Sequence, residues 1–183
     1  LESPEVRGLV KNVINRWDPY VLLDSHTHNG SYHEEPVTFV WSLNPNGDTS
    51  LVRFASDKMY REITTNLQKN YNILCIPHGD FLDVKNPDKG WKSLGPQPRY
   101  LSNYFGLRNR IGILNENYPY VDFETRVTGC YKLFRALLDF CFEYKDEIKN
   151  LIRDADHRNI QRGLFPGERD LFALEYDVRA LEE

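Results

Sequence analysis

The stretch that decides the fold is YVLLDSHTHNG, residues 20–30. Its first four residues are almost all apolar, as is typical of a strand covered on both faces in an α/β sheet. The polar residues that follow such a strand are held rigidly at the sheet edge where ligands bind. An Asp-x-His-x-His pattern in this place predicts a metal site, and the alternative is that its histidines cap or pack.

Length and composition describe one compact domain. The chain has 183 residues, of which 40% are hydrophobic and 27% charged, and this suits an ordered domain with a real core. The net charge is −4 with both signs mixed along the chain, which argues against nucleic acid as a partner because phosphate binding needs a basic face. No apolar stretch is long enough to span a bilayer.

The two ends of the chain read like positions inside a longer protein. The sequence begins at Leu1 without a starting methionine or a signal peptide, and it stops at Glu183 without a terminating pattern. We therefore expect residues 1–183 to be part of a longer polypeptide. The sequence itself does not indicate a compartment or an oligomeric state.

The pass along the chain predicts an α/β fold with a mixed β-sheet flanked by helices, because strand patterns alternate with helical ones. Helices are expected over residues 3–17, 49–69 and 123–152, and strands over 20–23, 37–41, 71–76, 110–114 and around 174–178. Residues 77–98 are expected to be a long loop. The inward face of the third helix is expected to carry Val127, Tyr131, Phe134, Leu138, Cys141 and Phe142. The three cysteines, at 75, 130 and 141, lack metal-type spacing and are interpreted as small apolar residues.

His26 is the strongest candidate for a metal ligand. Zinc takes neutral imidazole nitrogen readily, and a catalytic zinc has about three protein ligands and one open position. Asp24 can orient the ring or cap a loop amide. His28 lies on the same side of an extended chain, so it is a second ligand or a pocket wall. We interpret His33 as exposed or at the rim, and the histidines at 78 and 157 as structural.

Glu116 is the second candidate, because it sits just past the expected strand Ile111 to Leu114. A carboxylate at the end of a strand in an α/β sheet lies where ligands bind. Beside a zinc ion, such a glutamate can take a proton from water and later give it to a leaving amine. The alternative is an exposed loop acid.

The stretch 100–110 precedes Glu116 and carries arginine and tyrosine donors, among them Tyr104 and Arg108. Such donors can anchor an anionic group. Equally, Arg108 and Arg110 can pair with surface acids.

Two segments together resemble a known family: LDSHTHNGSYH, residues 23–33, and NYFGLRNRIGILNENY, residues 103–118. They are similar to the zinc carboxypeptidases of the carboxypeptidase A type, and most like bacterial members with Gly-Ser-Tyr-His followed by Leu-Asn-Pro-Asn, here residues 43–46. The resemblance extends from the first helix to the long helix, and the order and separation of the motifs carry it.

This resemblance implies a zinc-exopeptidase-like fold, a Zn²⁺ cofactor and a peptide substrate that loses its C-terminal residue. It places the family's last zinc ligand on His26 and its general base on Glu116. His28, which stands where the family has a tyrosine, is expected to bind substrate together with Tyr104 and Arg108. The resemblance also favours an exported protein.

The chain also departs from the family in the residues that it lacks. The family's first two zinc ligands come from a His-x-x-Glu motif, and no such motif occurs in residues 1–183. The family's arginine and asparagine that hold the substrate carboxylate also lie upstream. The resemblance therefore implies the C-terminal portion of a catalytic domain, an incomplete domain that by itself binds zinc poorly and is inactive.

Two other functions remain open. An amidohydrolase-type hydrolase also places Asp-x-His-x-His after its first strand, with both histidines on the metal, but such barrels need about 250 residues. A non-catalytic domain of peptidase-like fold is the other, binding peptide or glycan through aromatic residues at 32, 41, 100 and 104.

Overall fold

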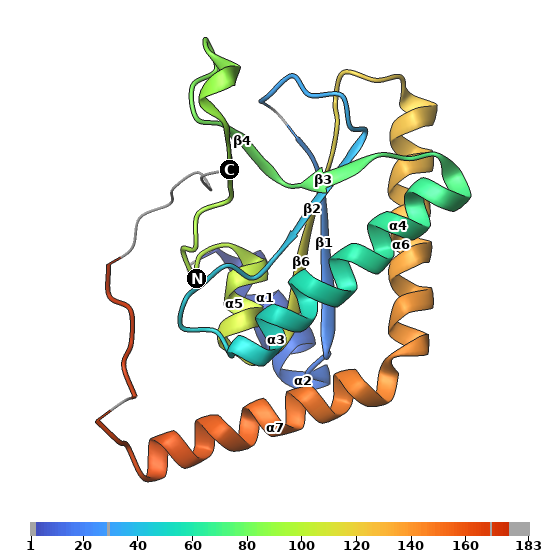
Figure 1. The fold of residues 1–183 in the computed structure, drawn as a ribbon. Coiled ribbons are helices and arrows are strands. Elements are labelled where there is room, and N and C mark those ends of the chain that lie inside the picture. The colour runs from blue at the N-terminus through green and yellow to red at the C-terminus, as the bar shows by residue number, and fades with distance from the viewer. Residues whose placement is uncertain (1–2, 29, 169, 176–183) are drawn as a thin grey trace.

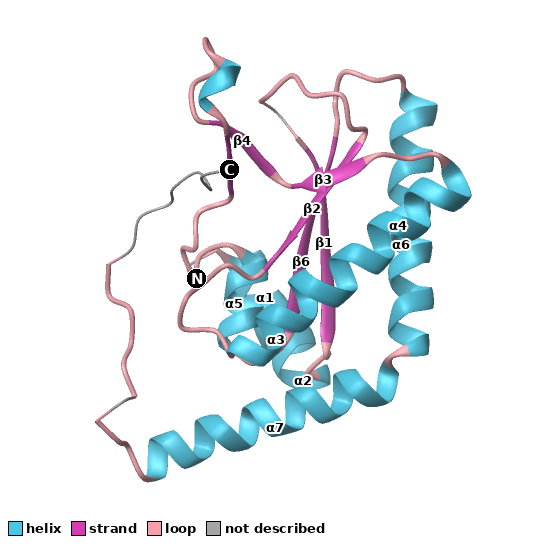
Figure 2. Ribbon diagram, in the orientation of Figure 1, coloured by secondary structure: helices cyan, strands magenta, loops and turns pink. Residues whose placement is uncertain are grey.

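The computed structural model describes residues 3–28, 30–168 and 170–175. Its main sheet has the strand order β1 (Val21–Thr27), β6 (Ile111–Asn117), β2 (Val37–Trp41) and β3 (Cys75–Pro77) (Figures 1 and 2). Strands β1 and β6 are parallel, β6 and β2 antiparallel, and β2 and β3 parallel. The predicted mixed sheet in an α/β fold is confirmed.

Helices cover both faces of this sheet. The second long helix runs through α3 (Thr49–Arg53), a π-helical stretch (Phe54–Tyr60) and α4 (Arg61–Tyr71), and it shares one face with α6 (Phe123–Glu143). Helix α5 (Leu101–Leu107) packs on β6 and β1 from the other side, and α7 (Lys145–Leu164) crosses below α3 (Figure 1). The first helix comprises α1 (Pro4–Leu9), a π-helical stretch (Val10–Ile14) and α2 (Asn15–Trp17).

Alternation along the strands separates the core from a polar face. Val37, Phe39, Ile111 and Ile113 point into the core under α4 and α6. Their neighbours in sequence therefore point to the α5 side, because successive side chains of a strand alternate between faces. At the carboxyl ends of β1 and β6 this second face carries the charged residues of the two strands.

Helix α5 approaches the sheet closely because of a glycine. A Cβ at Gly112 would lie 2.6 Å from the carbonyl oxygen of Ser102 on α5. Any side chain at this position would force the helix away from β6, so the tight α5–sheet contact depends on glycine here.

Several boundaries differ from the sequence prediction. Strand β1 continues to Thr27, so His26 lies within the strand and not in the loop after it. The predicted strand 71–76 is the end of α4 followed by the short β3. The predicted loop 77–98 contains a hairpin of β4 (Gly79–Phe81) and β5 (Trp91–Ser93), with a 3₁₀ turn (Pro87–Lys89) between them.

The predicted long helix is in fact two helices. It breaks at Tyr144 into α6 and α7, which run in different directions (Figure 1). The predicted last strand is absent at Leu174, which is exposed and extended without partners among the described residues. The rest of that prediction, residues 176–178, lies outside the described part of the chain.

The inward face predicted for the third helix is wrong. Five of its six predicted residues, those at 127, 131, 134, 138 and 142, are 47–75% exposed. The face that packs on the core instead carries Gly129, Leu133, Ala136, Leu137 and Phe140. A Cβ at Gly129 would lie 2.9 Å from Val37, so the small residues mark the side on which α6 approaches the sheet.

Candidate functional site

His26 and Glu116 occupy facing positions on two adjacent parallel strands. They are direct Cα partners in the β1–β6 ladder, at the carboxyl end of both strands. Paired residues of neighbouring strands project to the same face. The structure therefore brings the imidazole and the carboxylate together on the α5 side of the sheet.

Asp24 fixes the orientation of the His26 ring. Nε2 of His26 lies 2.7 Å from Oδ1 of Asp24. Because the carboxylate accepts, the neutral ring carries its proton on Nε2 and keeps a lone pair on Nδ1. The His26 side chain is half exposed, so this nitrogen can reach a ligand from outside the strand pair. A carboxylate behind a histidine is the usual support of a metal ligand.

Glu116 holds an unpartnered carboxylate oxygen. Its Oε2 is buried and has no hydrogen-bond partner among the described residues. Burial raises the pKa of this carboxyl above its ordinary value of 4.5, and the nearby rings of His26 and His28 offset part of that rise. A buried carboxylate with a raised pKa is a better proton acceptor than an exposed one.

The Glu116 carboxyl lines an open pocket of about 250 Å³. Opposite it lies the β4–β5 hairpin, which contributes Asp80 and Lys92. The remaining lining residues are His28, Gly30, His78, Gly79, Ser93, Leu94 and Gly95. Among the described residues, His26 is not part of the lining and lies on the neighbouring strand.

His28 forms a wall of this pocket. Its Nδ1 accepts a hydrogen bond of 2.9 Å from the amide of Gly30, so the proton sits on Nε2, which lies 3.2 Å from the carbonyl oxygen of Gly79. Both ring nitrogens are therefore engaged by the backbone. Of the two roles that the sequence left open for His28, the geometry favours the wall over the metal ligand.

His78 lines the same pocket, although the sequence predicted only a structural role for it. The hydroxyl of Thr38 donates to the carbonyl oxygen of Glu116 at 2.9 Å, so it accepts from Nδ1 of His78 at 3.1 Å. Burial lowers the pKa of His78 to about 4, and the ring is neutral near pH 7. No local pattern signals this role, because Thr38 lies 40 residues away.

His33 is buried and not exposed or at the rim, as the sequence suggested. Its side chain is 4% exposed and packs on Tyr118, with ring centroids 4.5 Å apart, and against Trp91. Neither ring nitrogen has a hydrogen-bond partner among the described residues. Burial lowers the pKa of His33, so it supports the site as a neutral ring.

The structure does not bring Tyr104 and Arg108 to this pocket. Both lie by the amino-terminal end of β6, and the five residues from Ile111 to Glu116 span about 17 Å. Arg108 points to the Tyr104 hydroxyl at 3.4 Å. Arg110 hydrogen bonds to Asp18 and to Asp156. Of the two roles that the sequence left open for this arginine, anchoring an anionic group or pairing with acids, the structure therefore shows pairing with acids.

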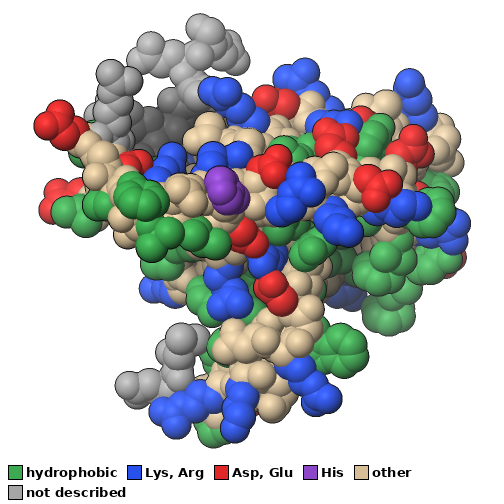
Figure 3. Space-filling view, turned by 90° about the horizontal axis from the view of Figure 1, so that it is seen from below, with side chains coloured by type: hydrophobic (Ala, Val, Ile, Leu, Met, Phe, Trp, Pro, Cys, Tyr) green, Lys and Arg blue, Asp and Glu red, His purple; other side chains and the backbone are tan. Residues whose placement is uncertain are grey.

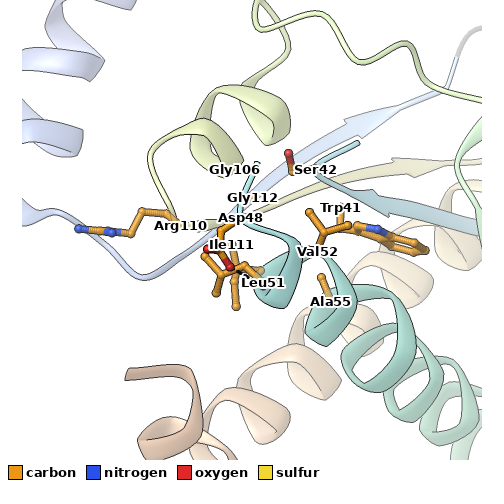
Figure 4. A pocket seen from close by; sticks show the side chains of 10 residues that line it. All are labelled: Trp41, Ser42, Asp48, Leu51, Val52, Ala55, Gly106, Arg110, Ile111 and Gly112. Carbon is orange, nitrogen blue, oxygen red and sulfur yellow. Dashed lines mark hydrogen bonds between the residues drawn. The ribbon is translucent and has the colours of Figure 1, made fainter. Parts of the chain in front are cut away.

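A second, much smaller pocket lies beside α5. It measures about 10 Å³, which is room for one water at most, and its lining is mainly apolar. Figure 4 shows that Arg110 extends away from the other lining residues, which come from the end of β2, the start of the α3 helix, Gly106 of α5 and the start of β6.

The described residues do not by themselves supply a complete set of metal ligands. Nowhere in residues 3–28, 30–168 and 170–175 do three histidine, cysteine, aspartate or glutamate residues gather as a metal site. The Asp24–His26 pair fits one zinc ligand with its support, and the unpartnered Oε2 of Glu116 fits a base beside it. Further ligands would have to come from outside these residues.

Comparison of the chain with protein-family models, with curated proteins and with solved structures finds no match. Within the described ranges, every helix is too short or too polar to cross a bilayer.

Proposed function

We propose that this chain carries the last zinc ligand and the general base of a zinc-dependent carboxypeptidase, a hydrolase that removes the C-terminal residue of a peptide. The observation that supports this most is the unpartnered, buried Oε2 of Glu116 in direct register with His26. Burying a carboxylate oxygen without a partner is costly, and such groups are usually kept for chemistry.

In this proposal Nδ1 of His26 is a zinc ligand and Asp24 holds the ring in place from Nε2. Zinc, when bound, lowers the pKa of water toward ~7 and polarises the scissile carbonyl. The other zinc ligands would come from outside the described residues.

Glu116 takes the proton of the attacking water and gives it to the departing amine. Burial raises the pKa of the Glu116 carboxyl, and a carboxylate with a raised pKa is a stronger proton acceptor. Lys92 adds a positive charge to the pocket lining, which favours a substrate with a free carboxylate.

Two observations bear on the alternatives. The engaged nitrogens of His28 leave no second histidine of the Asp-x-His-x-His pattern for a metal, which disfavours an amidohydrolase-type site. A binding role gains support from Tyr32 and Tyr120, which stack with centroids 4.5 Å apart and are 70% and 53% exposed. Loss of catalysis would however leave the buried Glu116 carboxylate unexplained.

The test is hydrolysis by the natural gene product that contains this chain, on blocked peptides with either a free or an amidated C-terminus. We expect release of the last residue from the free form alone, loss of the activity with a chelator, and recovery with zinc. His26→Ala should lower the zinc content by elemental analysis, whereas the control His157→Ala, at an exposed position on α7, should not. Zinc content that is equal in the two variants would remove His26 as a ligand.

A further inference from the structure

The β4–β5 hairpin carries an acid and a base directly opposite each other at the pocket of Glu116. Asp80 of β4 and Lys92 of β5 are Cα partners in this antiparallel pair, and both line the pocket. Directly opposed residues of two antiparallel strands project to the same face, where opposite charges usually attract each other. The hairpin therefore presents one negative and one positive side chain to the same space.

These two charges do not pair with each other. Oδ1 of Asp80 accepts a hydrogen bond of 2.8 Å from the amide of Phe81. Among the described residues, no hydrogen bond or ion pair engages Oδ2 of Asp80 or the ammonium of Lys92. Farther out on the same hairpin, Lys89 and Asp83 do form an ion pair, of 2.7 Å. The hairpin thus pairs its charges away from the pocket and leaves them apart at the pocket.

Charged groups at the α7 end of the molecule are paired as well. In the view from below, Lys and Arg side chains lie among those of Asp and Glu along α7 (Figure 3). Arg158 of α7 bonds to Asp48 at 2.9 Å, and Glu147 of α7 bonds to Lys58 at 2.6 Å. The pocket at the hairpin is the better candidate for a charged ligand, because its two charges are still available.

A missing side chain leaves space beside the Asp80 carboxylate. A Cβ at Gly30 would lie 3.6 Å from Oδ2 of Asp80 and 3.2 Å from Cε1 of His28. The pocket measures about 250 Å³, which is smaller than the roughly 300–1,000 Å³ of pockets for drug-sized ligands. These dimensions suit a ligand of few atoms.

We propose that the hairpin pocket binds a small zwitterion, a molecule with one ammonium and one carboxylate, of which a free amino acid is the simplest case. Oδ2 of Asp80 accepts from the ligand ammonium, and the Lys92 ammonium donates to the ligand carboxylate. The buried, unpartnered Oε2 of Glu116 on the opposite wall offers the ligand ammonium a further acceptor. A ligand with a single charge would satisfy only one member of the Asp80–Lys92 pair.

This inference goes beyond the proposed function, because such binding requires neither zinc nor a peptide bond. The C-terminal residue that the proposed hydrolysis releases is itself a zwitterion of this kind, so the two proposals are compatible. Each of them can nevertheless fail without the other.

The test compares three probes that share one methyl side chain: alanine, N-acetylalanine, which has only the carboxylate, and alaninamide, which has only the ammonium. Each probe is titrated into the protein with a chelator present, and the amide signals of Gly79, Lys92 and Gly95 are followed by NMR. We expect alanine to bind at least about tenfold more tightly than either other probe, because each charge-assisted hydrogen bond contributes to affinity. Equal affinity for the three probes, or an absence of alanine binding, would overturn the proposal.

Two variants separate the two charges. Asp80→Asn keeps an oxygen for the Phe81 amide but loses the negative charge, and Lys92→Met keeps a long side chain but loses the positive charge. Each should weaken alanine binding at least about tenfold. Asp80→Asn should leave the affinity for N-acetylalanine unchanged, and Lys92→Met should leave that for alaninamide unchanged. A general disturbance of the hairpin would instead weaken the binding of both probes.

The controls are Asp88→Asn and Lys85→Met, which remove the same charges at exposed positions of the same hairpin outside the pocket. Both should bind alanine as the wild type does. Equal losses in the controls, or unchanged alanine affinity in Asp80→Asn and Lys92→Met, would overturn the proposal. Hydrolysis by a protein that does not bind alanine would overturn it and leave the proposed function standing. Alanine binding by a protein without zinc or activity would contradict the proposed function and leave this inference standing.

Discussion

The two ends of the β1–β6 ladder differ in how their charged groups are hydrogen-bonded. At the amino-terminal end the Arg110 guanidinium is almost buried and bonds to Asp18, Asp156 and two backbone carbonyls. Its hydrogen bonds lower the pKa of Asp18. At the carboxyl end, Glu116 keeps a buried oxygen without a partner among the described residues. The first end pairs its buried charge with hydrogen-bond partners, whereas the second leaves a buried carboxylate oxygen without one among the described residues, at a cost in stability.

The largest expected effect that separates the two ends is on catalysis. Glu116→Gln in the complete protein should keep zinc and lose about 10²–10⁴-fold in turnover, because the amide cannot accept the proton of the attacking water. Peptide hydrolysis with a matched zinc assay measures this. Glu34→Gln, at an exposed position in the loop before β2, is the control and should retain activity. Turnover of Glu116→Gln at the wild-type rate would exclude Glu116 as the base.

The next effect concerns the opposite end of the ladder. Arg110→Ala should lower the free energy of unfolding by about 2–3 kcal/mol. The change would leave two carboxylates and two backbone carbonyls without the hydrogen bonds that the guanidinium donates to them. Arg108→Ala should cost less than about 1 kcal/mol, since Arg108 is a third exposed and lies 4.0 Å from Asp18. Urea denaturation of both variants measures the two losses in unfolding free energy. Equal losses for Arg110→Ala and Arg108→Ala would contradict the structural role given to Arg110.

A smaller effect is the acid sensitivity of His78 at the site. The pKa of His78 in the folded chain, about 4, lies below the ordinary 6.5. Between these two pH values the ring therefore binds a proton in the unfolded chain but not in the folded chain. Stability contributed by the neutral ring is present above pH 6.5 and is lost as the pH falls toward 4, at up to about 1.4 kcal/mol per pH unit.

His78→Asn should make the unfolding free energy less dependent on pH in that window. His157→Asn, at an exposed position, is the control. If the two variants have the same pH profile as the wild type, His78 is not the buried neutral ring described above.

The smallest effect tests the cost of the unpartnered carboxylate. The folded pKa of Glu116 is raised, so its contribution to stability is greatest below pH 4.5 and is lost as the pH rises through the folded pKa. Glu116→Gln should therefore stabilise the fold at pH 7, by about 1 kcal/mol or 2–4 °C in melting temperature. The gain should shrink as the pH falls. A loss of stability at pH 7 would show that the carboxylate has a partner.

The sequence predicted the sheet and the meeting of its two polar groups better than it predicted the helices. Residues 20–23 are an apolar run, and residues 37–41 are apolar except for Thr38, so their strands were recognisable. The extension of β1 through His26 was not, because polar residues at the end of a strand read as a loop. The pairing of those residues with β6 keeps them extended.

The helices show what a one-dimensional pattern leaves open. In α6 two apolar faces overlap in sequence, and periodicity does not say which of them meets the sheet. Gly129 and Ala136 do say so, because small side chains permit close approach. The roles of His33 and His78 were also beyond the sequence, since their partners come from loops and strands far along the chain.

The proposal that His26 is a zinc ligand beside Glu116 can be tested directly by anomalous diffraction at the zinc edge from crystals of the complete protein. We expect a zinc peak about 2.0–2.1 Å from Nδ1 of His26. The carboxylate of Glu116, on the neighbouring strand, should lie beside this peak. A zinc ion bound elsewhere, with His26 still paired only to Asp24, would contradict the proposal.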